Sequence, residues 1–242
     1  MQSRFGTTSW TQVLAARTSS SPGSRQALET LCQNYWYPVY AFVRRQGHDA
    51  ESSRDLTQAY FATLLEKDYL GDYDPARGRF RVFLKTSVKH FLSKEAEKAR
   101  TWRRGGRTGM ETIGEDFEGR YRNEPADDVT PERIFERRWA LSMLERALGR
   151  LRDEHPEAGR QAEFDQLKTF LTGELPKRSY RDIAVALETT EGAVKTSVHR
   201  LRQRFGTLLR EAIAETVAHP DDVDDEVRYL LGVIAPWGGQ GA

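Results

Sequence analysis

The sequence predicts an all-α protein in which two small helical domains are joined by a flexible acidic linker. Apolar residues recur at helical spacing in successive segments of the chain, which is typical of amphipathic helices. The 242 residues are 38% hydrophobic and 30% charged, a ratio that favours modest cores over one extensive core. Glycine, proline and aspartate gather between the periodic segments, where they indicate turns and domain boundaries.

The periodic segments and the stretches between them divide the chain into five parts. We expect an N-terminal extension over 1–24, a first helical domain over 25–105, a linker over 106–131, a second helical domain over 132–212 and a C-terminal extension over 213–242. The linker contains Gly, Asp, Glu, Asn and Pro with little periodicity, as expected of a solvated tether. Shielding of the neighbouring basic surface by its acidic residues is the alternative.

The first domain is predicted to contain three helices. The first, over 25–43, is crowded with aromatic residues, which are more typical of a core than of a binding site. The second covers about 51–67, and the stretch 71–78 after it consists of turn-forming residues. The third runs over about 80–103 and carries lysine and arginine between its apolar positions.

The charged residues separate into two adjacent blocks, although the net charge of the whole chain is only +1. Residues 77–107 contain eleven basic side chains against two acidic ones, whereas residues 111–136 contain nine acidic against three basic ones. A block this basic is typical of a surface that binds phosphates. A solvated helix face is the alternative explanation of the charge alone.

The second domain is predicted to begin where Thr130 can cap a helix whose first residue is Pro131. An apolar stripe at helical spacing follows this start and continues to Leu151. A further helix is expected over 158–171, because apolar residues recur there before Gly173 and Pro176 end the pattern.

A helix-turn-helix is predicted at about residues 178–205. A short amphipathic helix over 179–187 precedes a turn in which Thr190 can cap the next helix, 191–205. A helix of this kind fits the major groove of DNA, where Lys and Arg donate to guanine or to phosphate. The candidate groove-reading residues on its polar face are Lys195, Thr196, Ser197, His199, Arg200 and Arg204. A helical hairpin with a basic solvated face is the alternative.

Several classes of protein are disfavoured by the sequence. The chain has one cysteine and hence no intramolecular disulfide, it shows no signal peptide, and no apolar run approaches the roughly 20 residues that cross a bilayer. We therefore expect a cytoplasmic protein with no membrane partner. The five histidines show no metal-binding spacing, and neither a phosphate loop nor a nucleophile motif is present. We expect no catalysis, cofactor or metal.

Both domains resemble sigma factors of the extracytoplasmic-function (ECF) type, the smallest bacterial promoter-specificity subunits. The matching stretches are 35–40, 55–61 and 74–84, which resemble the family's region 2, and 180–184 and 191–200, which resemble its region 4. The family commonly has glycine in the turn of the helix-turn-helix where this chain has Glu188. Glu188 can occupy this turn if its backbone keeps a negative φ, which is the conformation we expect for a residue with a side chain.

The resemblance implies that the two domains bind different elements of a promoter. Region 4 would hold the −35 promoter element through the groove-reading residues of the second helix. Region 2 would bind the −10 element as a separated single strand, a task that needs cationic grooves and aromatic faces. The candidates for this contact are Arg79, Lys85, Lys89, His90, Trp102 and Arg103, with Phe80 and Phe83 as supports.

The second predicted helix would dock on the clamp of core RNA polymerase through Asp55 and Gln58, and the second domain would dock on the flap. The family's acidic run is mostly missing here, and only Asp55 survives. The chain resembles a subgroup thought to depend on a Ser/Thr protein kinase, and a phosphate would restore negative charge. Thr57 is the first candidate, although its place on the helix predicts partial burial, while Ser52 and Ser53 are expected to be more exposed. A packing role for Thr57 is the alternative.

Other interpretations remain open. The C-terminal extension combines apolar residues with an acidic cluster over 221–226, and we expect it to pack back onto its own domain; a partner surface is the alternative.

An autonomous repressor or activator is the alternative function, and it would need a dimer to read two half-sites. Such a protein binds duplex DNA tightly alone, whereas a sigma factor needs polymerase. An anti-sigma partner is left open.

Overall fold

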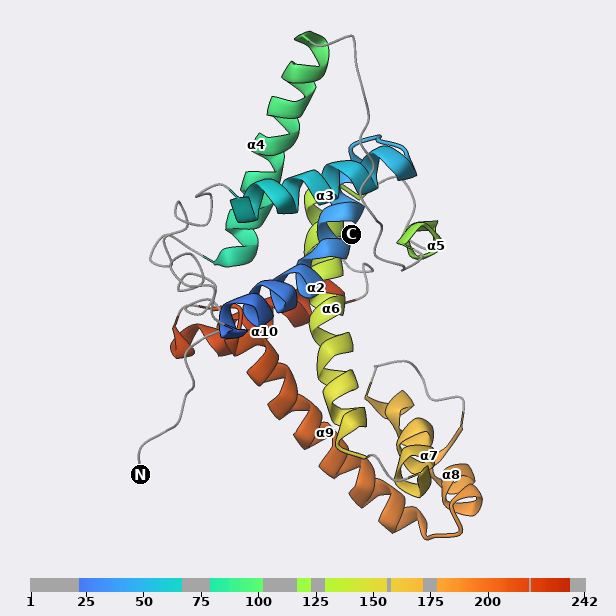
Figure 1. The fold of residues 1–242 in the computed structure, drawn as a ribbon. Helices are drawn as coiled ribbons and strands as arrows, with labels where there is room; N and C mark the ends of the chain where they lie inside the picture. Colours follow the sequence, from blue (N-terminus) through green and yellow to red (C-terminus); the bar gives the residue numbers. More distant parts are fainter. Residues whose placement is uncertain are drawn as a thin grey trace, which may run out of the picture. The chain divides into compact units, whose positions relative to one another are not determined.

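The computed structural model describes residues 22–66, 79–101, 117–122, 129–155, 158–171, 178–217 and 219–235. Every regular element in these ranges is a helix, so the predicted all-α class is confirmed (Figure 1). The contacts divide the chain into two compact units. The first unit comprises Met1–Ser142 with Glu215–Ala242, and the second comprises Met143–Ala214.

The helices follow the predicted order along the chain. The first unit contains α2 (Pro22–Arg45), α3 (Ala50–Glu66), α4 (Phe80–Thr101), α5 (Phe117–Arg122), the first half of α6 (Pro131–Asp153), the short 3-10 helix η4 (Pro220–Asp222) and α10 (Val223–Ile234). The second unit contains the rest of α6, α7 (Ala158–Leu167), the 3-10 helix η3 (Lys168–Phe170), α8 (Tyr180–Ala186) and α9 (Glu191–Ala214). The last of these extends well beyond residue 205, where the sequence pattern placed its end.

The core of the first unit is built from aromatic rings, as their crowding in the sequence predicts. Tyr35 of α2 meets Phe80 of α4 edge to face, with the ring centroids 5.6 Å apart. Phe42 of α2 meets Phe135 of α6 in the same arrangement, at 6.5 Å. All four side chains are fully buried. Such edge-to-face pairs contribute about 0.5–1.5 kcal/mol beyond the burial of their area.

Within the predicted linker, the short helix α5 packs against α2, which differs from the flexible tether expected at these six residues. The ring of Phe117 is buried and lies 5.9 Å from that of Tyr37 and 5.7 Å from that of Tyr40. Glu118 accepts hydrogen bonds from Arg44 (2.9 Å) and Tyr40 (2.8 Å), and the bond from Arg44 lowers the pKa of Glu118. Six residues cannot sustain a helix in water by themselves, so these contacts with α2 hold α5 in place.

The C-terminal helix α10 also corrects an expectation, because it packs in the first unit and not with the helix-turn-helix. Leu230 is fully buried there. The ring of Tyr229 covers the guanidinium of Arg81 on α4, which lies 3.7 Å from the ring centroid. The physical reason is charge: α10 carries three acidic residues in its first turn, and α4 is the basic helix of this unit.

Each helix of the helix-turn-helix in the second unit begins with an N-cap. Ser179 and Asp182 form a capping box at the start of α8, in which Ser179 Oγ accepts from Asp182 N (3.2 Å) and Asp182 Oδ2 accepts from Ser179 N (2.9 Å). Thr190 Oγ1 accepts from Ala193 N (3.2 Å), which confirms the predicted cap of α9. One apolar face of α9, whose residues are spaced by three and four, is buried except for the half-buried Phe205: Val194, Val198, Leu201 and Leu208.

The turn between α8 and α9 forces Glu188 into the left-handed region. Glu188 N donates to Val185 O (3.3 Å) and Thr189 N donates to Ala184 O (2.9 Å), which is the Schellman arrangement at a helix C-terminus. This arrangement requires a positive φ at the residue after the cap, and Glu188 has φ 51°. The expectation of a negative φ is therefore wrong, and the glycine common in the family at this place is explained.

Replacing Glu188 with glycine is expected to raise the free energy of unfolding of the second unit by about 0.5–1 kcal/mol, because glycine adopts this φ without a Cβ penalty. The side chain is exposed and is not needed for packing. Thermal unfolding followed by far-UV circular dichroism measures the change. Glu188→Ala, which keeps the Cβ, should show no such gain, and an equal gain in both variants would disprove the explanation.

Candidate nucleic-acid interface

The outward face of α9 presents the predicted groove-reading residues to solvent. Lys195, Thr196, His199 and Arg200 are exposed, and Ser197 is half-buried. Lys195 pairs with Glu191 at 2.7 Å, one turn earlier on the same helix. By contrast, His199 and Arg200 have no hydrogen-bond or ion-pair partner among the described residues. They are therefore basic side chains of this face that can bind an incoming ligand without first breaking a contact.

Arg204, the last of the predicted contacts, is held within the second unit. Its Nε lies 2.8 Å from Glu154 Oε2, and this hydrogen bond lowers the pKa of Glu154. A second carboxylate, that of Glu211, lies 3.8 Å away. A phosphate would have to replace Glu154 before Arg204 could bind DNA.

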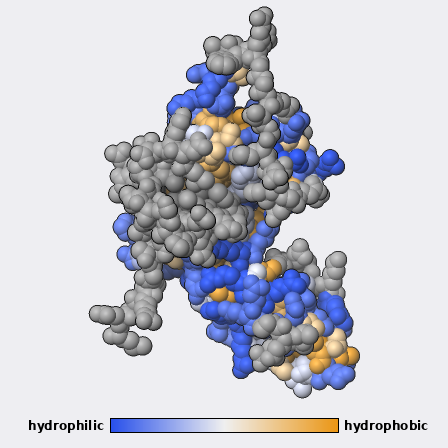
Figure 2. Space-filling model, viewed as in Figure 1, coloured by the Kyte–Doolittle hydropathy of each residue, from blue (hydrophilic) through white to orange (hydrophobic). Residues whose placement is uncertain are grey.

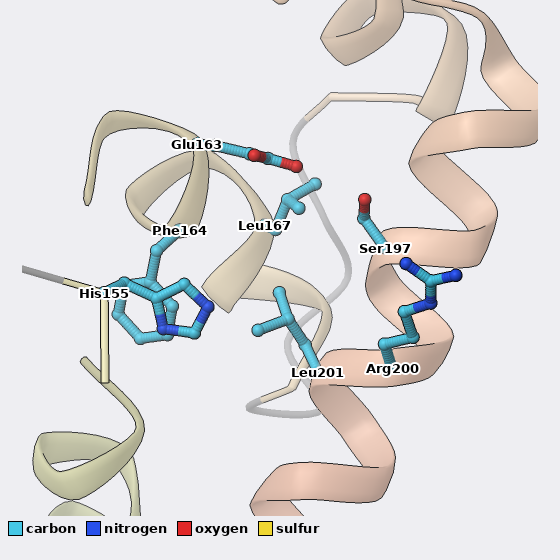
Figure 3. A pocket seen from close by; sticks show the side chains of 7 residues that line it. All are labelled: His155, Glu163, Phe164, Leu167, Ser197, Arg200 and Leu201. Atoms are coloured by element: carbon cyan, nitrogen blue, oxygen red, sulfur yellow. The ribbon is translucent and has the colours of Figure 1, made fainter. Parts of the chain in front are cut away.

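A pocket of about 200 Å³ lies beside this face, between α7 and α9 (Figure 3). Ser197 and Arg200 line it from α9, and Phe164 lines it from α7. The ring of His155 stacks on Phe164 with centroids 5.8 Å apart, and its Nδ1 lies 2.8 Å from Leu151 O. Apolar side chains of α7 therefore lie beside the polar face of α9 within the second unit.

Hydrophilic residues cover most of α9 in the view of Figure 2, whereas apolar residues gather around α8. Val185 of α8 contributes to this difference because 76% of its area is exposed. In a helix-turn-helix the second helix enters the groove and the first crosses the backbone. The distribution of polar residues therefore agrees with α9 as the reading helix.

The basic face of α4 is largely neutralised by acidic residues of the same unit. Glu226 of α10 pairs with Arg79 at 2.6 Å and with Arg81 at 2.5 Å. Lys85 pairs with Glu136, and Lys89 pairs with Glu132 of α6. Of the remaining candidates for the −10 strand, His90 is exposed, and Trp102 and Arg103 lie outside the described residues. The supporting rings differ, since Phe80 is fully buried and Phe83 is half-buried.

Arg81 is the centre of this cluster, although the sequence analysis counted it only as part of the basic block. Its side chain is 8% exposed and lies between the rings of Trp139 (5.2 Å) and Tyr229 (3.7 Å). Glu136 completes the site at 3.6 Å from Arg81 Nη1. Burial alone would raise the pKa of Glu136, but hydrogen bonds from Lys85 and Tyr229 outweigh it and lower that pKa.

Acidification is expected to destabilise the first unit through Glu132 and Glu136. A hydrogen bond from Lys89 lowers the pKa of Glu132, and the pKa of Glu136 is lowered as described; both lie below the ordinary 4.5. The unfolded chain therefore takes up protons first as the pH falls, so stability present above pH 4.5 is lost as the pH falls below it toward the folded pKa values.

Urea unfolding between pH 7 and pH 3 measures this loss, with the ordinary pKa of 4.5 inside the range. The two tryptophans that the structure describes, Trp36 and Trp139, both lie in the first unit, so we follow unfolding of that unit by tryptophan fluorescence. The double variant Glu132→Gln with Glu136→Gln should show a flatter pH dependence than the unchanged chain. An identical dependence in both proteins would contradict the assignment of the effect to these carboxylates.

The polar face of α3 holds the predicted clamp contacts, but two of its three candidate hydroxyls are buried. Asp55 is exposed and Gln58 is half-buried. Thr57 is fully buried, and its Oγ1 donates to Ser53 O at 2.7 Å. Ser53 is also fully buried, so the expectation that it is exposed is wrong. The reason is that Ser53 and Thr57 lie on the opposite, buried face of α3, which they share with Tyr60 and Leu64. Ser52 is half-buried and therefore in part accessible.

The acidic partners Glu136, Glu154 and Glu226 were not predicted from the sequence. Each is far from its basic partner in sequence, for example 145 residues for Glu226 and Arg81. The only available signal was that an acidic segment complements the basic block. The part of the chain that the structure describes contains no group of three metal-ligating side chains, and none of its helices is long and apolar enough to cross a membrane.

Comparison with known proteins gives two distant relatives. The chain is 25% identical over 204 residues to the RNA polymerase sigma-H factor of Pseudomonas aeruginosa, covering 80% of this chain and 91% of that protein. It is 27% identical over 179 residues to the ECF RNA polymerase sigma factor SigE of Mycolicibacterium smegmatis, covering 74% of this chain but only 60% of the relative. No family model and no solved structure matches.

Sigma factors are transcription initiation factors and not enzymes, which agrees with the expectation of a non-catalytic protein. The described part of the chain is all-helical and contains a capped helix-turn-helix, on whose outward face His199 and Arg200 pair with no described residue. The chain is therefore similar over most of its length to two RNA polymerase sigma factors, one of which is named as an ECF sigma factor.

Proposed function

We propose that the chain binds core RNA polymerase in the cytoplasm and directs it to promoters, with α9 in the major groove of the −35 element and α4 on the single strand of the −10 element. The observation that carries the proposal is the exposed pair His199 and Arg200 in the N-terminal half of α9, where neither has another partner among the described residues. Side chains at this place in a helix-turn-helix reach base edges.

Docking on polymerase is assigned to the clamp for α3 and to the flap for the second unit. Asp55 is the exposed carboxylate left in the family's acidic run and would meet basic residues of the clamp. Co-elution of the full chain with core polymerase in gel filtration tests this. Asp55→Lys should weaken co-elution, whereas Glu51→Lys, an equal change on an exposed residue of the same helix, should not. Equal behaviour would contradict the docking surface.

The same preparation separates the proposal from an autonomous repressor. A sigma factor should bind duplex promoter DNA weakly alone and tightly with polymerase. Tight and specific binding of duplex DNA by the chain alone, with no co-elution, would favour the repressor.

The regulatory part of the proposal is phosphorylation of α3 by a Ser/Thr kinase, and we place the phosphate at Ser52. Ser52 lies in the first turn of α3, where the helix dipole favours a negative group, and its backbone N donates to Asp49 Oδ1 at 2.7 Å. Thr57 is disfavoured because a kinase could reach its buried hydroxyl only after local opening of the helix.

Ser52→Glu should therefore bind core polymerase more tightly than Ser52→Ala in the gel-filtration assay. Thr57→Glu should instead lower stability, since it places a charge in the core. If Ser52→Glu and Ser52→Ala bind equally, phosphorylation at Ser52 is not the switch.

A further inference from the structure

We propose that α10 is an internal competitor for the nucleic-acid surface of α4: Glu226 and Asp222 occupy Arg79 and Arg81, and α10 must leave before a single strand can bind these cations. The inference rests on the proposed function, because that function assigns the α4 surface to the −10 strand. It gives the C-terminal extension a role as an autoinhibitory element.

The geometry shows an anion already seated where a phosphate would bind. Glu226 is 1% exposed, and its carboxylate bridges the two arginines. Its Oε2 lies 2.6 Å from Arg79 Nη1, while Arg81 donates to both oxygens, from Nε to Oε1 at 2.5 Å and from Nη2 to Oε2 at 3.4 Å. The backbone oxygen of Asp222 accepts a further hydrogen bond from Arg79 at 3.2 Å. Guanidinium groups bind carboxylate and phosphate through the same fork of donors, so the two anions exclude each other.

Three properties of the contact between α10 and α4 favour its displacement by a nucleic acid. One face of the helix makes it, because Glu226, Tyr229 and Leu230 are spaced by three and four residues, whereas the neighbouring Leu231 is 55% exposed. The desolvation of buried ion pairs offsets much of their attraction. A helix of 12 residues is also unstable once it leaves its docking site. Release of α10 therefore means local unfolding of the chain end.

With competition of this kind, the apparent affinity for a strand equals the intrinsic affinity multiplied by the fraction of molecules in which α10 is released. The smaller this fraction is, the weaker the observed binding. Weakening the α10 contact should increase that fraction without changing the cations themselves. A freed arginine also adds a phosphate contact, and each contact steepens the salt dependence of single-strand binding by about 0.7 in log–log slope.

The test is binding of the full chain to a fluorescent single-stranded oligothymidylate of about 16 nucleotides, measured by anisotropy at several salt concentrations. Glu226→Gln removes the bridging carboxylate. Asp225→Asn is the matched control, because it removes one charge from the same first turn of α10 while its partner is the exposed Arg228 of the same helix. We expect Glu226→Gln to bind roughly threefold to tenfold more tightly than the unchanged chain, with a steeper salt dependence, and Asp225→Asn to bind like the unchanged chain.

Equal affinities of Glu226→Gln and Asp225→Asn would overturn the proposal, as would absence of binding by all three proteins. Hydrogen exchange of the unchanged chain tests the proposal even if Glu226→Gln does not fold. Saturation with the oligonucleotide should speed the exchange of the backbone amides of α10. Unchanged protection of these amides would contradict the release of α10. Co-elution with core polymerase is measured on the same proteins. A chain that co-elutes but shows no competition retains the proposed function and loses only this inference.

Discussion

Trp139→Ala is expected to lower the free energy of unfolding of the first unit by about 3–5 kcal/mol. The side chain is fully buried, and it meets Arg81 at 5.2 Å and Tyr229 at 6.5 Å. Its removal leaves a cavity and takes an aromatic wall from the arginine that anchors α10. Urea unfolding followed by the fluorescence of the remaining tryptophans measures the loss.

Trp139→Phe serves as the control for this substitution. Phenylalanine keeps an aromatic ring beside Arg81 and leaves a smaller cavity, so its loss should be clearly smaller than that of alanine. A loss below about 1 kcal/mol for Trp139→Ala would be typical of a surface position. That result would contradict the placement of Trp139 in the core.

Arg200→Ala is expected to weaken recognition of the −35 element by about 1–3 kcal/mol, or roughly 5-fold to 150-fold. The guanidinium is exposed in the N-terminal half of α9 and pairs with no described residue, so its loss removes a DNA contact without disturbing the fold. The measurement is the affinity of the complex with core polymerase for a promoter fragment, compared with a fragment whose −35 element is scrambled.

The matched control is Arg210→Ala, which removes the same exposed side chain ten residues further along α9, or about 15 Å along the helix axis. Arg210→Ala should keep the discrimination between the two fragments. An equal loss in both variants would indicate a general charge effect, and no loss for Arg200→Ala would contradict its place in the groove.

The elements that the sequence predicted well are those fixed by neighbouring residues. Thr130 and Thr190 cap the helices that follow them, as expected, with Thr130 Oγ1 accepting from Arg133 N at 3.3 Å. The apolar steps along α9 predicted its buried face, because helical periodicity is a local property. The first residues of α3 and α4 also agree with the prediction within one residue.

The features that escaped prediction depend on residues far apart in the chain. The pairing of Arg79 and Arg81 with Glu226 joins segments about 145 residues apart, and no local pattern encodes it. The burial of Ser53 could not be read from a polar side chain at the start of a helix, since it follows from how α3 packs. The positive φ of Glu188 was missed because the Schellman hydrogen bonds override the preference of the residue.

Transcription by purified core polymerase on fragmented genomic DNA tests the central proposal most directly. With the chain added, we expect new transcripts whose start sites share sequences at the −35 and −10 positions, and Arg200→Ala should reduce them. If the chain yields no transcripts and binds duplex DNA tightly without polymerase, it is not a sigma factor.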